Sequence, residues 1–360
     1  MIIFNEARPK YEKLDELLSQ QLIDIKFSNQ VNIIIDLKEI IRKFFRPDIG
    51  INETKSSLEI EEISSDILGI IAHYRNYFYK KGKYTSFYFM YSYKKCDEFI
   101  KDYPDYKKEY YEKYIFGDYP KCDIAKRAIE VIEKVSKCFP HVEFIETSKF
   151  DEYIYTKFLQ TILNKNEITL ILSNDQIFYQ LINDNTFILN IKGIKSQLVT
   201  PENCLQVLSK KDNIGISSKL LPLILAIGGC KKASIAGLPN VATIKAINII
   251  SKLCKDNKII DSNLIELPIK FSELNPKVNS EKNLIDNKDL ITSNYKFIRG
   301  DEIMYKNILS LKNDFLFGKK IIAKSYFLEL NSKIFAAYPL HLEMMLKGEE
   351  IKWKKQTGHQ

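Results

Sequence analysis

Short apolar runs rich in β-branched and aromatic residues alternate with stretches of helical periodicity along most of this chain. The runs are VNIIIDLK (31–38), TSFYFMYS (85–92), VEFIET (142–147) and ITLILS (168–173). Continuous apolar runs of this length are typical of strands buried on both faces of a parallel sheet. The stretches between them, chiefly 58–80, 123–138 and 151–164, have apolar residues at helical spacing. The alternation predicts an α/β fold, a parallel sheet flanked by helices.

The pattern changes toward the C-terminus. FILNI (187–191) and the apolar pair Leu198 and Val199 predict a short hairpin, and the chain turns helical from about residue 217. Residues 275–294 are polar and rich in turn formers, which indicates a linker or long loop. We therefore expect an N-terminal extension (1–30), a main domain (31–275) and a C-terminal linker with an accessory or partner-binding region (276–360).

Composition limits the classes of function. The 360 residues have a formal net charge of +8, which permits an acidic partner such as nucleic acid, although Lys-, Asn- and Ile-rich usage also follows from an AT-rich genome. The six cysteines include no CxxC pair and the four histidines are scattered, so we expect reduced thiols and no zinc site. A charged N-terminus and the lack of a long apolar run predict a cytoplasmic protein, in the host cytoplasm if viral.

Four segments carry more specific patterns. IIIDLKEIIRKFF (33–45) is a strand that ends at Asp36 and runs into a helix with an aromatic end. FYFMYSYKKCDEFIKDYPDYKKEY (87–110) contains a Tyr-Pro-x-Tyr-Lys pattern. ITLILSNDQIFYQLI (168–182) places Ser173 and Asp175 after a strand. LILAIGGCKKASIAGLPNVATIKA (223–246) has Gly and Pro at spacings that specify one particular loop.

Together these segments resemble the 5′-nuclease superfamily, which includes flap endonucleases, phage-type RNase H exonucleases and the 5′-nuclease domain of bacterial DNA polymerase I. The resemblance covers about residues 31–250 and implies a PIN-like sheet, a helix-three-turn-helix element at about 217–250 and a helical C-terminal region. It also implies that Asp36 and Asp175 stand at metal-binding positions. Magnesium would be the metal, because carboxylate oxygens are its preferred protein ligands.

Most of the family's other acidic positions are not acidic here. They fall on Ser92 or Tyr93, on Ile177, and on Cys230 and Ala233. A further acidic pair falls on Thr156 and Lys157 or on Tyr153 and Ile154, with Asp151 or Glu152 near the family's Glu position. If Lys157 points inward, it places a positive charge where a cation would sit.

The loss of carboxylates bears on catalysis. Two-metal hydrolysis needs two divalent ions about 4 Å apart, and each needs anionic ligands. Asp36 and Asp175 would hold at most one weakly bound magnesium ion, so no catalytic residue is assigned. The sequence favours an inactive nuclease-like protein; if active, it would be a metal-dependent 5′–3′ exonuclease or flap endonuclease.

Nucleic-acid binding can persist without catalysis. In the helix-three-turn-helix element, backbone amides near Gly237 and Asn240 would face phosphates, with Lys231, Lys232 and Lys245 adding charge. Here Asn240 and Ala242 replace two loop glycines; Asn tolerates a positive φ but Ala does so poorly. The competing interpretation of the lysines is an ordinary solvated surface.

Residues 93–114 correspond to the segment that threads a single strand in the family. Basic and aromatic residues alternate there, and the candidate contacts are Lys94, Lys95, Tyr106, Lys107 and Lys108. Interspersed acidic residues cancel the charge, so a charged helix with a buried tyrosine face competes with this interpretation.

Three functions remain open from sequence. The first is a DNA-binding pseudonuclease in replication, repair or recombination, viral in origin, acting on branched or single-stranded/duplex junction DNA. The second is a structural or adaptor subunit of a viral replication, transcription or virion assembly, with a protein partner bound through 276–360. The third is a divergent active nuclease with ligands from elsewhere, for which Glu39, Asp48 and Asp184 are candidates.

Overall fold

The computed structural model describes thirteen stretches of the chain and leaves gaps between them. They are residues 30–38, 56–92, 101, 103–108, 129–130, 132–133, 136, 141–147, 149–163, 166–190, 197–209, 216–260 and 266–314. Almost all of the expected N-terminal extension, the helix at 39–45 and most of 93–140 therefore lie outside the described residues, as do residues 315–360.

A six-stranded sheet has the strand order β3-β2-β1-β4-β5-β6. Its strands are β1 (Gln30–Asp36), β2 (Tyr84–Tyr91), β3 (Val142–Glu146), β4 (Ile168–Leu172), β5 (Thr186–Asn190) and β6 (Gln197–Val199). The first five are parallel, and β6 pairs antiparallel with β5. The four predicted strands and the hairpin are confirmed.

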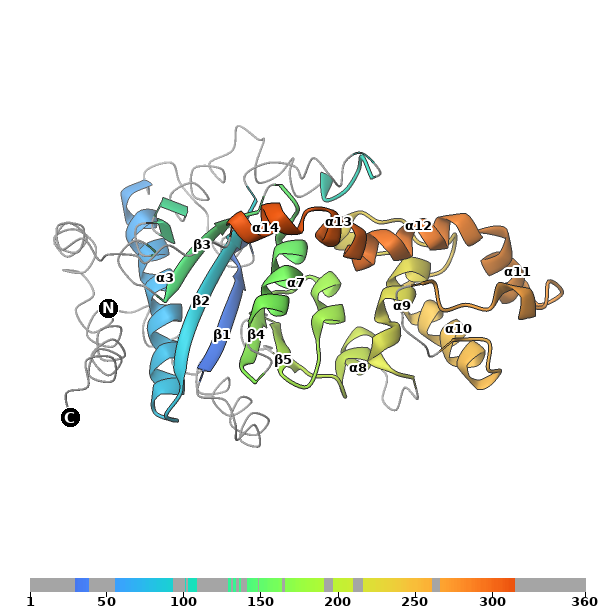
Figure 1. Ribbon diagram of the computed structural model, residues 1–360, viewed down its shortest axis with the longest axis horizontal. Coiled ribbons are helices and arrows are strands. Elements are labelled where there is room, and N and C mark those ends of the chain that lie inside the picture. The colour runs from blue at the N-terminus through green and yellow to red at the C-terminus, as the bar shows by residue number, and fades with distance from the viewer. Residues whose placement is uncertain are drawn as a thin grey trace.

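The central strands are buried on both faces, as their apolar runs predict. All of β4 is buried, and in β1 only Gln30 is partly exposed. The long helix α3 (Ser56–Tyr79) packs on β2 (Figure 1), and the Thr156 hydroxyl of α7 (Glu152–Ile162) donates to the Met90 Sδ of β2 at 3.1 Å. Because β2 and β4 flank β1 on opposite sides, the chain direction across the sheet reverses at β1. Clefts at such reversals are where open parallel sheets place their functional sites.

After β6 the described chain is helical and extends away from the sheet (Figure 1). After the short 3₁₀ helix η1 (Gln176–Leu181) come α8 (Cys204–Ser209), η3 (Ser218–Leu220), α9 (Leu221–Gly228), η4 (Lys231–Ala233) and α10 (Thr243–Lys255). These are followed by η5 (Phe271–Glu273), α11 (Asn279–Asp286), α12 (Lys288–Arg299), α13 (Asp301–Lys306) and α14 (Ile308–Asp314). A helical C-terminal region is therefore confirmed.

The expected linker at 275–294 is wrong, because α11 and most of α12 occupy it. Leu284 and Ile291 are fully buried, and α12 packs against α9. The apolar residues recur at helical spacing, but the many Asn and Lys residues between them obscure the pattern. No helix among the described residues has the length and apolarity to cross a membrane.

Candidate functional site

Acidic side chains converge at the carboxyl ends of the two central strands. Asp36 is the last residue of β1, and Asp175 follows β4 by three residues. Asp175 caps η1 by accepting a hydrogen bond from the Ile177 N–H at 3.1 Å. Asp151 caps α7 in the same way, accepting from the Tyr153 N–H at 3.0 Å, and Glu152 begins that helix. The strand ends and helix starts thus bring four carboxylates to one place.

A buried lysine lies among these carboxylates. The Lys38 Nζ is 3.2 Å from Asp36 Oδ2, 3.6 Å from Glu152 Oε2 and 4.0 Å from Asp175 Oδ2. Its side chain is only 6% exposed. Lys38 follows Asp36 by two residues, so the same strand end supplies both the carboxylate and the ammonium.

A second buried lysine approaches from the segment at 103–108. The Lys107 Nζ lies 2.5 Å from Asp151 Oδ2 and 2.9 Å from Glu152 Oε2. Its backbone has a positive φ of 48°, and its N–H donates to the Ala233 carbonyl at 3.2 Å. Glu152 therefore bridges two ammonium groups. The ion cluster comprises Asp36, Lys38, Lys107, Asp151, Glu152 and Asp175.

Burial and pairing set the charges of the ion cluster. Burial opposes the charged form of Lys38, but Asp36 and Glu152 outweigh it and raise its pKa well above the usual value. Burial likewise opposes the Glu152 carboxylate, yet Lys107 and Lys38 lower its pKa far below normal. At Asp151 burial prevails over Lys107 and raises the pKa. Glu152 is therefore the anion on which both ammonium groups depend.

Hydroxyl groups and apolar side chains occupy the positions around the ion cluster. Ser173 donates to Asp36 Oδ2 at 2.9 Å and accepts from the Asp175 N–H at 3.1 Å. At the next strand ends, the Ser92 and Thr147 hydroxyls bond to each other at 2.9 Å. The other replaced acidic positions are also buried: Ile177, Cys230 and Ala233 lie in the apolar core, and so do Tyr153 and Ile154, while Thr156 is buried on α7.

Lys157 does not supply the inward charge that the sequence suggested. Its Nζ pairs with Asp301 and donates to the Arg299 carbonyl at 2.6 Å. Lys157 is five residues after Glu152, about 140° around the helix, so the two side chains point in different directions. The charge comes instead from Lys38 and Lys107, which sequence reasoning did not assign to this role.

The ion cluster does not fit a pair of divalent metal ions. The two ammonium nitrogens lie between the carboxylates where such ions would need oxygen ligands at about 2.0–2.1 Å. Among the residues that the structure describes, no group of three or more His, Cys, Asp or Glu is arranged to hold a metal. The buried geometry is that of an ion-pair network.

The helix-three-turn-helix element runs from α9 through η4 to α10. Its loop packs backbone against backbone: a Cβ added to Gly237 would lie 2.4 Å from both Gly228 C and Gly229 N. Asn240 adopts a positive φ of 59°, as expected, whereas Ala242 has φ −85° and needs no glycine. The replacement of two loop glycines therefore does not prevent the loop from closing.

The residues expected to contact nucleic acid differ in their exposure to solvent. Lys231, Lys245 and Asn240 are exposed, Gly237 is half-buried, and Lys245 Nζ donates to the Asn240 carbonyl at 3.1 Å. Lys108 is exposed and pairs with Asp105 at 3.4 Å. Lys94, Lys95 and the Lys232 side chain lie outside the description.

Tyr106 and Lys107 are in the interior, contrary to a surface role. Tyr106 is 1% exposed and packs edge-on against Phe297 of α12. Lys107 is 2% exposed and pairs with the carboxylates above, so a phosphate cannot reach it in this arrangement. Tyr106 is thus buried, as the competing interpretation expected of its tyrosines, but residues 104–107 form a turn and not a helix.

Of the three carboxylates suggested as alternative metal ligands, the structure describes one. Asp184 is exposed in the turn before β5, at the amino end of the strands and away from the ion cluster. Glu39 and Asp48 fall outside the described residues.

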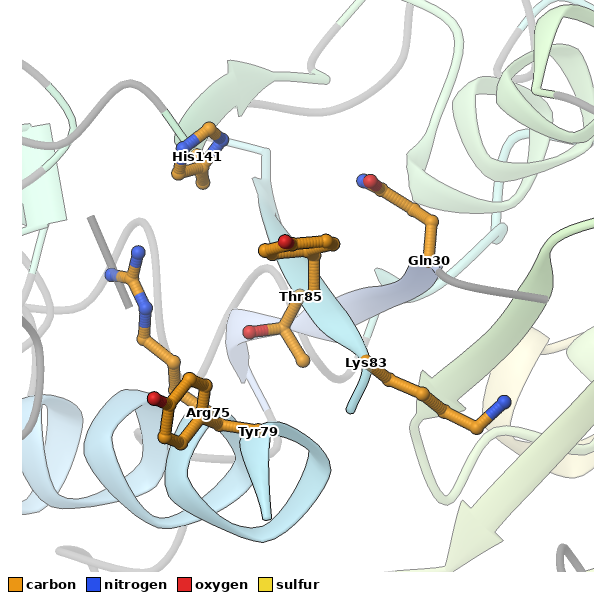
Figure 2. Close-up of a pocket in the computed structure, with 7 residues that line it drawn as sticks. Gln30, Arg75, Tyr79, Lys83, Thr85 and His141 are labelled. Atoms are coloured by element: carbon orange, nitrogen blue, oxygen red, sulfur yellow. The ribbon is translucent and has the colours of Figure 1, made fainter. Parts of the chain in front are cut away.

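A small pocket lies at the opposite end of the sheet (Figure 2). Gln30 at the start of β1, Thr85 near the start of β2, and Arg75, Tyr79, Lys83, Tyr84 and His141 line it. Its volume of about 10 Å³ has room for about one water molecule. Because Gln30 and Thr85 lie at the amino ends of their strands and the ion cluster lies at the carboxyl ends, the pocket is separate from the ion cluster.

Comparison with known proteins rests on structure alone. No protein-family model and no curated protein matches the sequence. Bacteriophage T5 5′-exonuclease with bound zinc matches at a TM-score of 0.52 and 13% identity, over 85% of this chain and 98% of that one. A bacteriophage T5 flap endonuclease variant, solved as a pseudo-enzyme–product complex with DNA and metal ions, matches at 0.53 and 14%, over 79% and 98%. The chain thus has the 5′-nuclease fold that its four motifs predicted.

Proposed function

We propose that this chain is a nuclease-like protein that binds DNA without cleaving it. One observation carries the proposal: the fold keeps the helix-three-turn-helix loop, but ammonium groups occupy the carboxylate cluster. A T5 flap endonuclease of the same fold has been solved with DNA. The phage origin of these neighbours favours a viral role in replication, repair or recombination.

Binding is attributed to the loop and to the start of α10. The N-cap residue Ala242 has no polar side chain to cap this end of the helix, and the first turn has no acidic residue, so its amide groups remain suited to an anion. Exposed Lys231 and Lys245 add positive charge beside the loop. Contacts of this kind recognise phosphates rather than bases, so binding should depend on the shape of the DNA and on salt.

The absence of cleavage is attributed to the ion cluster. A divalent ion would have to displace Lys38 or Lys107 from buried carboxylates, and breaking a buried ion pair costs roughly 3–5 kcal/mol. Without two metal ions, neither the attacking water nor the leaving oxygen is activated. The same cluster also weakens the alternative of a divergent active nuclease.

Gel shifts at increasing salt test this function on flap, nicked, single-stranded and plain duplex DNA. We expect binding that weakens steeply with salt, and no products with Mg²⁺ or Mn²⁺. The double variant Lys231→Ala/Lys245→Ala should reduce the salt slope by about 1–2. Lys255→Ala, an exposed lysine in the last turn of α10 and so at the other end of the helix from the loop, is the matched control. Cleavage that is lost in Asp175→Ala would refute the proposal.

A structural or adaptor role is the second candidate, and exposed apolar side chains favour it. Tyr305 and Leu309, on α13 and α14, are 65% and 74% exposed. An adaptor would show little DNA affinity in the same salt series and would purify with a protein partner. Leu309→Asp should then remove most of the affinity for that partner.

A further inference from the structure

We propose that the Lys38 ammonium is the built-in cation of a carboxylate cage formed by Asp36, Glu152 and Asp175, and that it excludes divalent metal ions. The proposal deepens the function above, because an occupied cage accounts for the absence of cleavage. It concerns a property of the free protein, however, and can be tested without DNA.

The geometry of the cage is that of one buried cation shared by three carboxylates, unlike a surface ion pair. Its three carboxylates come from separate segments: the end of β1, the start of α7 and the loop after β4. All three direct one oxygen toward the Lys38 Nζ, at 3.2, 3.6 and 4.0 Å. A single cation thus joins three parts of the fold that otherwise repel one another.

Burial makes that cation necessary. The side chains of Asp36, Glu152 and Asp175 are each 2% exposed or less, so water cannot neutralise them. Glu152 also has a second buried oxygen, Oε1, with no hydrogen-bond partner among the described residues. A lysine ammonium and a metal ion both relieve this repulsion, and the space between the carboxylates admits only one of them.

Lys107 does not replace Lys38 in this role. It contacts Glu152 and Asp151 but has no ion pair with Asp36 or Asp175 within the described part of the chain. Removal of the Lys38 ammonium would therefore take one buried cation away from Asp36, Glu152 and Asp175 together. Inward movement of the three carboxylates by about 1–2 Å would bring their oxygens to the 2.0–2.1 Å that Mg²⁺ requires.

Titration of Mn²⁺ without DNA tests the proposal. Binding is measured by the loss of the electron paramagnetic resonance signal of free Mn²⁺, and stability by thermal unfolding. The native chain should bind no Mn²⁺ in the cage and show no shift in Tm. Lys38→Ala and the longer, uncharged Lys38→Met should each bind one ion, and saturating Mn²⁺ should raise their Tm by roughly 5 °C.

Two further variants locate the ion. Lys157→Ala removes another partly buried ammonium of α7, one that pairs with Asp301 outside the cage, and should gain no Mn²⁺ site. The double variant Lys38→Ala/Glu152→Gln keeps the space but removes a ligand, and should lose most of the gained binding. If Lys38→Ala does not fold alone, refolding with Mn²⁺ should recover it, and the double variant should not recover.

Stoichiometric Mn²⁺ binding by the native chain, abolished by Asp36→Asn, would show that Lys38 excludes nothing. A lack of response in both Lys38 variants, in titration and in refolding, would show that the carboxylates form no cage for a metal. Native protein that excludes Mn²⁺ but fails to bind DNA would refute the proposed function and leave this inference standing.

Discussion

Glu152 is the residue on which the ion cluster depends most, because both buried ammonium groups contact its Oε2 atom. Glu152→Gln keeps the shape of the side chain and removes the charge, leaving Lys38 and Lys107 undercompensated. We expect the free energy of unfolding to fall by about 3–5 kcal/mol, measured by urea denaturation. Glu302→Gln, which breaks an exposed pair with Lys306, should cost less than about 1 kcal/mol. Equal effects would contradict the assignment.

His73 gives the protein a pH-dependent stability separate from the ion cluster. Burial, reinforced by Lys80, lowers the pKa of His73 from 6.5 to about 4. The unfolded chain therefore binds a proton between pH 6.5 and 4 that the native chain does not, so stability falls as the pH falls through this range. The loss should reach at most about 3 kcal/mol and end near pH 4.

This pH dependence can be assigned by comparing two proteins. Urea denaturation at pH 7, 5.5 and 4 is measured for the native chain and for His73→Gln, and the difference between their unfolding free energies is plotted. The difference should move in favour of the variant as the pH falls. A difference that stays constant would mean that His73 is accessible to protons in the folded state.

The sequence predicts which acidic residues lie at the strand ends, but it does not predict which side chains pair with them. The sequence shows that Asp36 and Asp175 end or follow central strands, which places them at one edge of a parallel sheet. It also shows Lys38 two residues beyond Asp36, yet a lysine at that position is usually solvated. Only the fold reveals that Glu152 and Asp175 enclose its ammonium, because those contacts join residues more than 100 positions apart in sequence.

At the level of elements, the helix-three-turn-helix loop depends on glycine where backbones touch. Gly237→Ala would place a Cβ 2.4 Å from the backbone of Gly228 and Gly229, so the loop must open. We expect a loss of more than 2 kcal/mol in stability and at least tenfold weaker DNA binding. Gly69→Ala is the control: apart from the backbone of α3 itself, no atom of the described residues lies within 4 Å of its added Cβ, so it should be neutral or stabilise by about 1 kcal/mol.

Strands were easier to predict than the helices near the C-terminus. The short β-branched runs of β1 and β4 are typical of buried strands, and their alternation with helices favours a parallel sheet. In α11 and α12 most residues are polar, and a few apolar ones such as Leu284 and Ile291 carry the packing. Propensity and polarity favour a loop there, and tertiary burial against α9 overrides them.

For the whole molecule, the C-terminal helices complete the core rather than append a separate unit. Asn294 of α12 donates to the Ala226 carbonyl of α9 at 3.1 Å and to the Ala236 carbonyl of the loop at 2.8 Å, and accepts from the Tyr103 hydroxyl at 3.1 Å. Tyr153 and Gln180 also bond carbonyls at the end of α12. The sheet side and the helical side are therefore joined through this helix.

A chain that ends at residue 275 should consequently not fold as an independent domain. It would lack Ile291, Tyr295 and Ile298, which are buried in the core, and would expose the faces of α9 and Tyr106 that pack against α12. Each large apolar side chain lost contributes roughly 2 kcal/mol. We expect aggregation, or a broad thermal transition with loss of near-ultraviolet circular dichroism. Asn294→Ala in the full chain should lower Tm while keeping one cooperative transition. A truncated chain that melts sharply and still binds DNA would show that residues 31–275 are an autonomous domain.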